Sequence, residues 1–290
     1  MDLNKLLDAA IKKSENGSEE EVYITIEGKA YENYMSNEKW VAFLKEMNKE
    51  HLIAYMQGYG NEISEKQGRY GIYPPKMASY GSSSRMIYKL LKTVEGIHFE
   101  KQLPTKVGGT ANLDGYLQRG ETEIFIEAKC REIYTKHANI DIKEVYDKVL
   151  EDIKSDDAFH YTKENKETKT GYLNYSFSYS ETPIVRFDIK QLICHFLGIA
   201  ANYIENKSAK NKICFIYLIY NPKDFNIKEL KDVYDSTIKE IKLFEPMMND
   251  LFNAIFDYQK KALNRDTKAP EFEFKTADQS TIEKIINSVK

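Results

Sequence analysis

Long apolar runs and cysteines are both scarce in this sequence. No run approaches the roughly 18 apolar residues of a membrane span, so we expect no membrane partner. The first residues, which include Asp2 and Lys5, predict a polar helix start rather than a signal peptide. The three cysteines lie in apolar segments without metal-site spacing, which predicts buried thiols of a cytoplasmic protein: Cys130, Cys194 and Cys214.

An excess of positive charge is also missing. The 42 Lys and Arg residues are balanced by 45 Asp and Glu residues, for a formal charge of −3. This balance excludes a global basic field that would attract nucleic acid, so such binding would depend on local patches and a metal ion. The sequence does contain enough apolar material for a sizeable core, with 42% hydrophobic residues and 21 tyrosines. Its 290 residues allow one large domain or two modest ones.

Hydrophobic periodicity divides the first third of the chain into helices, a strand and a long loop. Glycine and proline punctuate this loop, and loops of such length are usually functional or flexible. The serines at its end can cap the next helix. The expected elements are helix 1–14, strand 22–26, helix 37–57, loop 58–84 and helix 85–92.

The order of elements in the rest of the chain is more informative. Three strands follow, then an insertion, a largely apolar helix and a continuous apolar strand of the kind buried on both faces. The core order is therefore αβββ, insertion, αβ. The expected elements are strands 97–103, 112–117 and 123–130, insertion 131–187 with a charged helix and a tyrosine-rich hairpin 172–179, helix 188–204, strand 213–220, an amphipathic helical region 227–263 and a polar tail 264–290 with a last short helix.

Two acids and a lysine fall on two adjacent predicted strands. Asp114 lies on the second strand, and Glu127, Ala128 and Lys129 lie near the end of the third. Acid-x-Lys triplets occur elsewhere in polar stretches, but charges at the end of an apolar strand are costly unless paired or metal-bound. This set can hold a divalent metal against a phosphodiester and position a water to attack it. A simple Glu–Lys ion pair on an edge strand is the alternative.

These residues and this order of elements resemble the PD-(D/E)xK nuclease superfamily, with its restriction endonuclease-like fold. The resemblance covers residues 80–222, although Leu113 stands where the usual proline precedes the aspartate. It implies an α/β (α+β) fold with a mixed central sheet flanked by helices. We expect a mostly helical region 1–79, a nuclease core 80–225 and a helical region 226–290. The residues that carry the resemblance to bacterial members are Ser82, Ser83, Ser84, Phe99, Glu100, Asn112, Asp114, Gly115, Glu127, Lys129 and Gln191.

The resemblance also implies roles for the central residues. Asp114 and Glu127 would each give a carboxylate oxygen to Mg²⁺, with Mn²⁺ as a substitute, and the Ala128 carbonyl would be a third ligand. Lys129 would hold the attacking water and stabilise negative charge that develops on the phosphate. No small-molecule cofactor is expected.

Two further residues have open assignments. Glu100 is either an outer-shell or second-metal carboxylate, or a surface partner of a nearby cation. Gln191 lies on a polar stripe of an apolar helix and is predicted to contact a metal-bound water or the phosphate. Asp188 and Gln191 also fit a helix capping box, which is the structural alternative. His195, on the same stripe, is interpreted as a core histidine.

Residues around this set are candidates for contacts with DNA. Helix-start amides and serine hydroxyls make natural phosphate contacts, and loop 58–84 could either order on DNA or simply link the N-terminal region to the core. The tyrosine-rich hairpin could stack on bases, but packing within the insertion is favoured. The candidate contacts are Ser83, Ser84, Arg85, Lys101 and Arg131.

The sequence thus predicts a Mg²⁺-dependent DNA endonuclease of restriction or defence type. A DNA repair or processing exonuclease is an alternative within the same fold. A non-catalytic nucleic-acid-binding module is the alternative from a different class. A symmetric homodimer is plausible, because double-strand cutting often requires two active sites.

Overall fold

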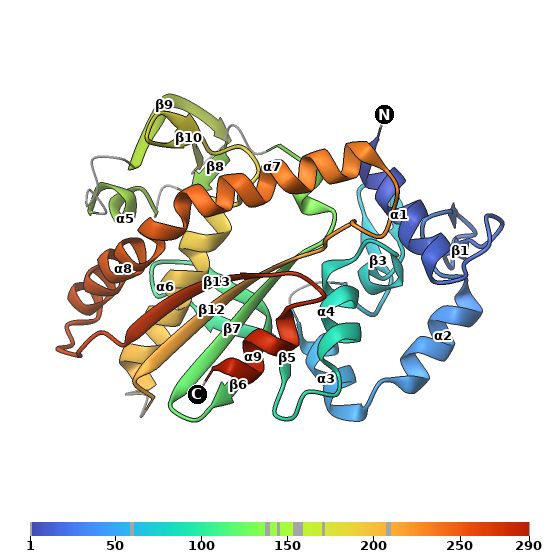
Figure 1. Ribbon diagram of the computed structural model, residues 1–290, viewed down its shortest axis with the longest axis horizontal. Coiled ribbons are helices and arrows are strands. Elements are labelled where there is room, and N and C mark those ends of the chain that lie inside the picture. The colour runs from blue at the N-terminus through green and yellow to red at the C-terminus, as the bar shows by residue number, and fades with distance from the viewer. Residues whose placement is uncertain are drawn as a thin grey trace.

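A five-stranded mixed sheet lies at the centre of the protein, and helices pack around it (Figure 1). The computed structural model describes residues 2–58, 61–136, 140–143, 146–152, 159–169, 172–206 and 210–289. Within these residues the chain belongs to the mixed α/β class, as predicted. The chain elements from residue 83 to 219 follow the expected order of helix, three strands, insertion, helix and strand.

The sheet combines an antiparallel meander with two parallel strands. β7 is the central strand and pairs antiparallel with β6 and parallel with β12. Every residue of β7 is buried, including Glu123, Glu127 and Lys129, and all but the first residue of β12 are buried, as its continuous apolar sequence predicted. In spatial order the strands are β13 (Glu271–Ala277), β12 (Lys212–Ile219), β7 (Thr122–Lys129), β6 (Thr110–Arg119) and β5 (His98–Pro104).

Helices cover both faces of this sheet. On one face, α4 (Ser83–Leu91) packs on β6 at Gly115, where a Cβ atom would lie 3.0 Å from Ile87 Cδ1. On the other face, His195 of α6 (Ile189–Asn206) packs near Phe215 of β12, with ring centroids 6.1 Å apart. Ser82 caps α4 by accepting a hydrogen bond from the Arg85 backbone N–H, as the serine cluster predicted.

The helix and the long loop expected in the N-terminal region both differ from their predictions. The expected helix 37–57 is two helices, α2 (Asn37–Glu46) and α3 (Lys49–Gln57). Met47 is extended between them, and the Asn48 side chain caps α3, so a capping residue in the middle of the apolar pattern breaks the helix. The expected loop 58–84 contains a hairpin of β3 (Lys66–Gly68) and β4 (Gly71–Tyr73) and a short 3-10 helix, η1 (Lys76–Ala78).

The remaining N-terminal elements are short. The expected helix 1–14 is present as α1 (Leu3–Ser14). The expected strand 22–26 is shorter, because β1 (Tyr23–Ile24) pairs with only the two residues of β2 (Ala30–Tyr31).

The C-terminal region contributes a strand to the sheet, contrary to the prediction of a polar tail. The helical region is α7 (Lys228–Phe244), η4 (Glu245–Met247) and α8 (Met248–Leu263), and the last helix is α9 (Ile282–Ser288). Between them, β13 pairs in parallel with β12 and buries Phe272 and Phe274. Its exposed alternate residues make the segment look polar in the sequence. None of the described helices is long and apolar enough to cross a membrane.

The insertion forms a separate small sheet, in which the expected hairpin 172–179 is instead a single strand that pairs antiparallel with an earlier strand, 159–169. Tyr175 of β10 is buried against Tyr161 and Phe177, so within the described side chains this strand packs internally rather than presenting Tyr175 for stacking on bases. The Tyr172 side chain lies outside the described residues. The elements are β8 (Ile140–Lys143), α5 (Asp147–Asp152), β9 (Phe159–Lys169), β10 (Tyr172–Tyr179) and β11 (Thr182–Pro183).

Candidate active site

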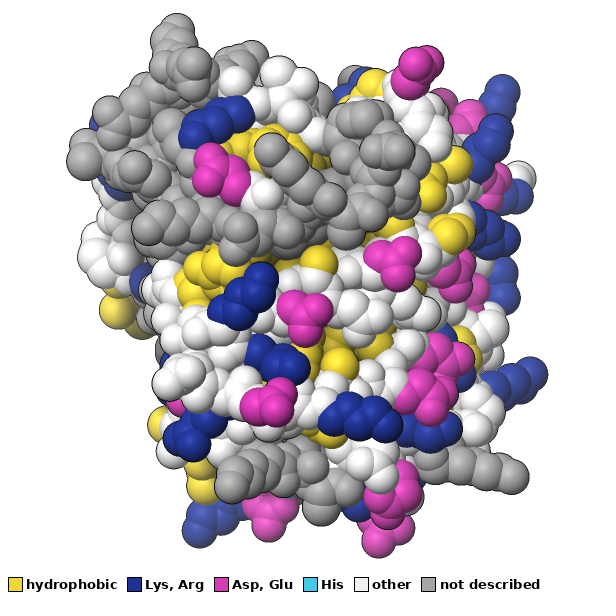
Figure 2. All heavy atoms as spheres, turned by 90° about the vertical axis from the view of Figure 1, so that its left-hand side faces the viewer, with side chains coloured by type: hydrophobic (Ala, Val, Ile, Leu, Met, Phe, Trp, Pro, Cys, Tyr) yellow, Lys and Arg dark blue, Asp and Glu magenta, His cyan; other side chains and the backbone are white. Residues whose placement is uncertain are grey.

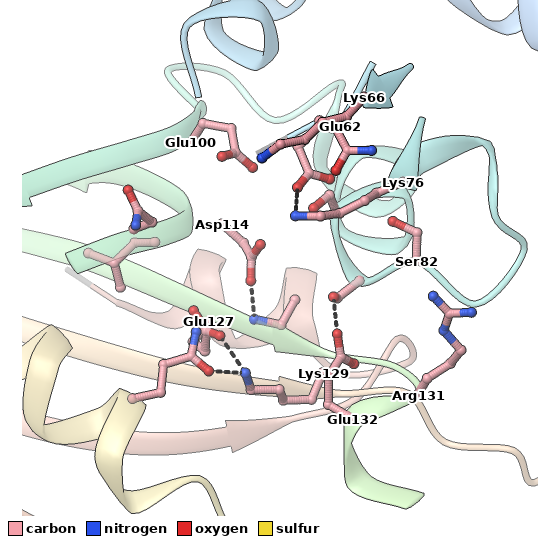
Figure 3. A pocket seen from close by; sticks show the side chains of 17 residues that line it. Glu62, Lys66, Lys76, Ser82, Glu100, Asp114, Glu127, Lys129, Arg131 and Glu132 are labelled. Atoms are coloured by element: carbon pink, nitrogen blue, oxygen red, sulfur yellow. Dashed lines mark hydrogen bonds and ion pairs between the residues drawn. The ribbon is translucent and has the colours of Figure 1, made fainter. Parts of the chain in front are cut away.

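A polar cleft of about 470 Å³ opens where the C-terminal end of β7 meets the starts of α4 and α6. Side chains from loop 58–84 close its far wall, and acidic groups point into it from several elements (Figure 3). The predicted residues Asp114, Glu127 and Lys129 all line it. The full lining is Asn61, Glu62, Lys66, Lys76, Ser82, Ser83, Ser84, Glu100, Asn112, Leu113, Asp114, Glu127, Ala128, Lys129, Arg131, Glu132 and Gln191.

Three of these carboxylates form a row across the sheet. The β5–β6 register pairs the residues on either side of Glu100 with those on either side of Asp114. The β6–β7 register reaches the pair Gly115–Ile126, one residue short of Asp114 and Glu127. Residues directly opposite on antiparallel strands share a face, with Cβ atoms about 4.5–5.5 Å apart. Extended by one residue, the two registers set Asp114 between Glu100 and Glu127, and the charges of both neighbours act on Asp114.

Asp114, in the middle of this row, is held by the backbone of β7. Its Oδ2 accepts a hydrogen bond of 2.7 Å from the Ala128 N–H. Burial, together with the negative charges of Glu127 and Glu100, nevertheless raises the pKa of Asp114 well above its usual value. The Ala128 N–H and the charge of Lys129 act in the opposite direction but are outweighed.

Glu127 is the anion of a buried ion pair. Its Oε1 lies 2.8 Å from Lys129 Nζ, and its Oε2 lies 2.9 Å from His195 Nε2. Burial acts to raise the pKa of Glu127, but the charges of Lys129 and His195 outweigh it and lower the pKa to about 2. Conversely, although burial acts to lower it, the pKa of Lys129 is raised well above its usual value by Glu127. Both groups are therefore charged inside the protein.

Lys129 also donates a hydrogen bond to Gln191 Oε1, which fixes its ammonium group between two acceptors. Gln191 reaches the site from the first turn of α6. Its own backbone N–H donates to Asp188 Oδ1 at 3.0 Å, so Asp188 caps the helix as predicted, and contact of Gln191 with a metal-bound water or a phosphate stays a prediction. The alternative of an ion pair on an edge strand is half right, because the pair exists but β7 is the central strand.

Glu100 faces the same cleft and has a strained backbone. Its φ of 55° lies in the left-handed region that non-glycine residues rarely adopt. The α3 end approaches it closely, since a Cβ atom on Gly58 would lie 2.7 Å from Glu100 Oε2. Burial, opposed by Lys76 and reinforced by Glu62 and Glu127, raises the pKa of Glu100 to about 7. Backbone strain of this kind clusters at functional sites.

The raised pKa of Glu100 predicts a measurable pH dependence. The folded protein keeps this proton up to about pH 7, whereas the unfolded chain releases it near its ordinary pKa of 4.5. Stability contributed by this group is therefore lost as pH rises from about 4.5 to about 7. Glu100→Gln removes the titration, so we expect the melting temperature measured in EDTA to fall less between pH 5 and 7.5. An identical pH profile in wild type and variant would contradict the assignment.

The donors in this cleft suit a divalent cation bound partly by water and substrate. Among the described residues, no group of three or more His, Cys, Asp or Glu side chains is arranged to hold a metal ion by itself. Mg²⁺, however, is usually bound by one or two carboxylates together with waters and phosphate oxygens. The raised pKa of Asp114 and the unpartnered buried Oε2 of Glu62 both indicate negative charge that a cation would compensate.

The predicted DNA contacts divide into two groups. Ser83, Ser84 and Arg131 line the cleft, and Arg131 also donates to Asp8 Oδ2 at 3.1 Å. Lys101 lies outside it, 4.8 Å from the Tyr116 ring centroid. Arg85 does not line the cleft either, because it is buried, pairs with Glu15 and lies against the Tyr80 ring. The prediction that Arg85 contacts a phosphate is therefore not supported.

Arg85 has a structural role that can be measured. We expect Arg85→Met to destabilise the protein by roughly 1–3 kcal/mol, because it removes a buried charge-assisted contact of Glu15. Lys89→Ala is the matched control, since Lys89 pairs with the same Glu15 at 2.8 Å but is 44% exposed; its cost should stay below about 1 kcal/mol. Urea unfolding measures both. If Arg85→Met folds normally but its DNA affinity depends less steeply on salt concentration than that of the wild type, Arg85 contacts a phosphate after all.

Sequence reasoning did not assign Glu62 to the site, and it gave His195 no role there. Glu62 and Lys76 come from loop 58–84 and form an ion pair of 2.8 Å in the cleft wall. His195, interpreted as a core histidine, is buried, but its partner is Glu127. His195 lies one helical turn after Gln191 on the same polar stripe. This position could have indicated that His195 faces the site. No comparable pattern marks Glu62.

No protein-family model, curated protein or solved structure matches this chain.

Proposed function

We propose that this protein hydrolyses phosphodiester bonds of DNA with a divalent metal, as an endonuclease of restriction or defence type. The observation that carries the proposal is the row of Glu100, Asp114 and Glu127 with Lys129 beside it, inside one polar cleft. The order α4-β5-β6-β7-α6-β12 supports a restriction endonuclease-like core of the PD-(D/E)xK type. A binding module would have no need for acids that raise one another's pKa.

Asp114, Glu127 and the Ala128 carbonyl would hold Mg²⁺ in this account. When bound, the metal supplies charge neutralisation at the phosphate and lowers the pKa of a water nucleophile. The Ala128 N–H fixes one oxygen of Asp114, which leaves the other oxygen directed at the cleft (Figure 3). Glu100 adds a third carboxylate to the same side.

Lys129 provides the fixed positive charge of the site. Its buried ammonium group, held by Glu127 and Gln191, requires no reorganisation when negative charge develops on a phosphate oxygen. A preorganised charge in a water-poor cleft is worth more than the same charge in water. Gln191 and His195 are positioning residues, because they contact Lys129 and Glu127 respectively.

The face of the molecule that Figure 2 shows has no patch of a single charge among its described residues. On the face that lies to the left in Figure 1, the coloured residues show cations and anions side by side (Figure 2). Lys66, Lys76 and Arg131 line the cleft together with its acids, with Lys76 paired to Glu62 and Arg131 to Asp8. A phosphate in the cleft would contact these cations and the bound metal.

Plasmid cleavage tests the proposal and separates the related activities. Supercoiled and linear DNA are incubated with Mg²⁺ or with EDTA. Discrete fragments from both substrates, seen only with Mg²⁺, indicate an endonuclease, and progressive loss from the ends of the linear form indicates an exonuclease. Retention of intact DNA in gel shifts, with no cleavage in Mg²⁺ or Mn²⁺, would instead indicate a binding module and overturn the proposal.

A further inference from the structure

The hairpin formed by β3 and β4 projects beside the cleft. Its strands pair from Lys66–Tyr73 to Gly68–Gly71, and only Arg69 and Tyr70 form the turn. Glycine is required at the second strand start, since Gly71 has a φ of 108°. The tight turn therefore places one cation and one aromatic ring at the tip.

The tip residues are available to a ligand. Tyr70 is 71% exposed, among the most exposed large hydrophobic residues of the described chain. The Arg69 guanidinium carbon lies 5.4 Å from the Tyr70 ring centroid. An exposed aromatic ring with a cation against it can stack on a nucleic-acid base while the cation faces the backbone.

The hairpin is connected to the cleft and braced from behind. Lys66, at its base, is one of the residues that line the cleft (Figure 3). The Ile72 N–H donates to Glu27 Oε2 at 3.0 Å, and the Tyr31 hydroxyl donates to the Ile72 carbonyl at 3.2 Å. A tip that is exposed yet held at its base can present its side chains in a defined place.

We propose that this hairpin binds the nucleic-acid strand that enters the cleft, with Tyr70 stacked on a base and Arg69 on a phosphate. The inference rests on the proposed function, because it takes the cleft as the place where a phosphodiester lies. Nucleic acid is favoured over a protein partner because the tip joins a cation to the aromatic ring and because Lys66, at the base of the same hairpin, lines the cleft.

The test uses fluorescence anisotropy with a labelled DNA duplex that has a single-stranded end, in EDTA so that the DNA stays intact. Tyr70→Ala should weaken binding roughly tenfold or more, and Tyr70→Phe, which keeps the ring, should not. Arg69→Ala should lower the slope of log affinity against log salt by about one. Matched controls are Val41→Ala and Lys45→Ala, exposed residues of α2 outside the cleft lining, which should bind like wild type.

A second assay separates this inference from the proposed function. An activated aryl phosphodiester, too small to reach the hairpin, reports the cleft alone. The inference is supported if the wild type hydrolyses this ester and the hairpin variants hydrolyse it equally well but bind DNA less tightly. Wild-type affinity in Tyr70→Ala and Arg69→Ala overturns it, as does a change in oligomeric state without a change in DNA affinity. If the wild type hydrolyses neither the ester nor DNA, the proposed function is wrong. Loss of DNA binding in the hairpin variants would still support the role of the hairpin in that case.

Discussion

Replacing Asp114 by asparagine should abolish DNA cleavage while leaving the metal-free protein at least as stable as wild type. Asparagine keeps an oxygen that can accept the Ala128 N–H but removes a charge from the middle of the carboxylate row. Loss of a single transition-state donor typically costs about 10²–10³-fold, and loss of a metal ligand should cost more. Relief of repulsion between facing like charges should contribute roughly 0.2–1 kcal/mol at pH 8.

Thermal melts with and without Mg²⁺ make this prediction specific. A ligand that binds only the folded state raises the melting temperature, so Mg²⁺ should stabilise the wild type but not Asp114→Asn. Asn112→Ala is a suitable control, since Asn112 lines the same cleft from the same strand without a charge. If Asp114→Asn were less stable than wild type in EDTA and still gained from Mg²⁺, Asp114 would be a structural hydrogen-bond acceptor rather than a metal ligand.

The second large effect concerns Lys129 and Glu127. Their side chains are only 7% and 4% exposed, so removing one partner leaves the other as a buried charge. We expect Lys129→Met and Glu127→Gln each to destabilise the protein by about 3–5 kcal/mol. The double variant should recover much of this loss, because neither charge then remains. Cleavage should fall by roughly 10²–10³-fold in Lys129→Met and should not return in the double variant.

A double-mutant cycle in urea measures the coupling directly. Recovery of stability without recovery of activity would separate the structural role of the pair from its catalytic role. Additive losses in the double variant would show that the two charges do not stabilise one another. Lys212→Met serves as a control, because its ion pair with Glu271 is exposed and should contribute little.

Much of the core could be predicted because its signals are local. The apolar run of β12 and the alternation that ends at Lys129 are properties of consecutive residues. Once the second and third strands are recognised, a hairpin register places Asp114 near Glu127, and the structure brings both to one cleft. Strand order and charge at the end of an apolar strand were therefore sufficient for the centre of the site.

The missed features depend on contacts that are distant in the sequence. Glu62 is an ordinary acid in a polar loop until the fold sets it beside Glu100. In the sequence Arg85 resembles a phosphate-binding cation next to a helix start. In the structure it is buried and donates a hydrogen bond to Glu15, seventy residues earlier. β13 is recognisable only through its partner β12, because its exposed Glu271 and Glu273 alternate with the buried Phe272 and Phe274 and make the segment look polar. Such placements are decided by tertiary packing.

We propose above all that Asp114 and Glu127 share a divalent cation in the cleft. The most direct test is anomalous diffraction from a crystal soaked in Mn²⁺, with an Asp114→Asn crystal treated in the same way. The account predicts a manganese peak in contact with Asp114 and Glu127 in the wild type and no peak there in the variant. A wild-type cleft without manganese, or a peak that persists unchanged in Asp114→Asn, would contradict it.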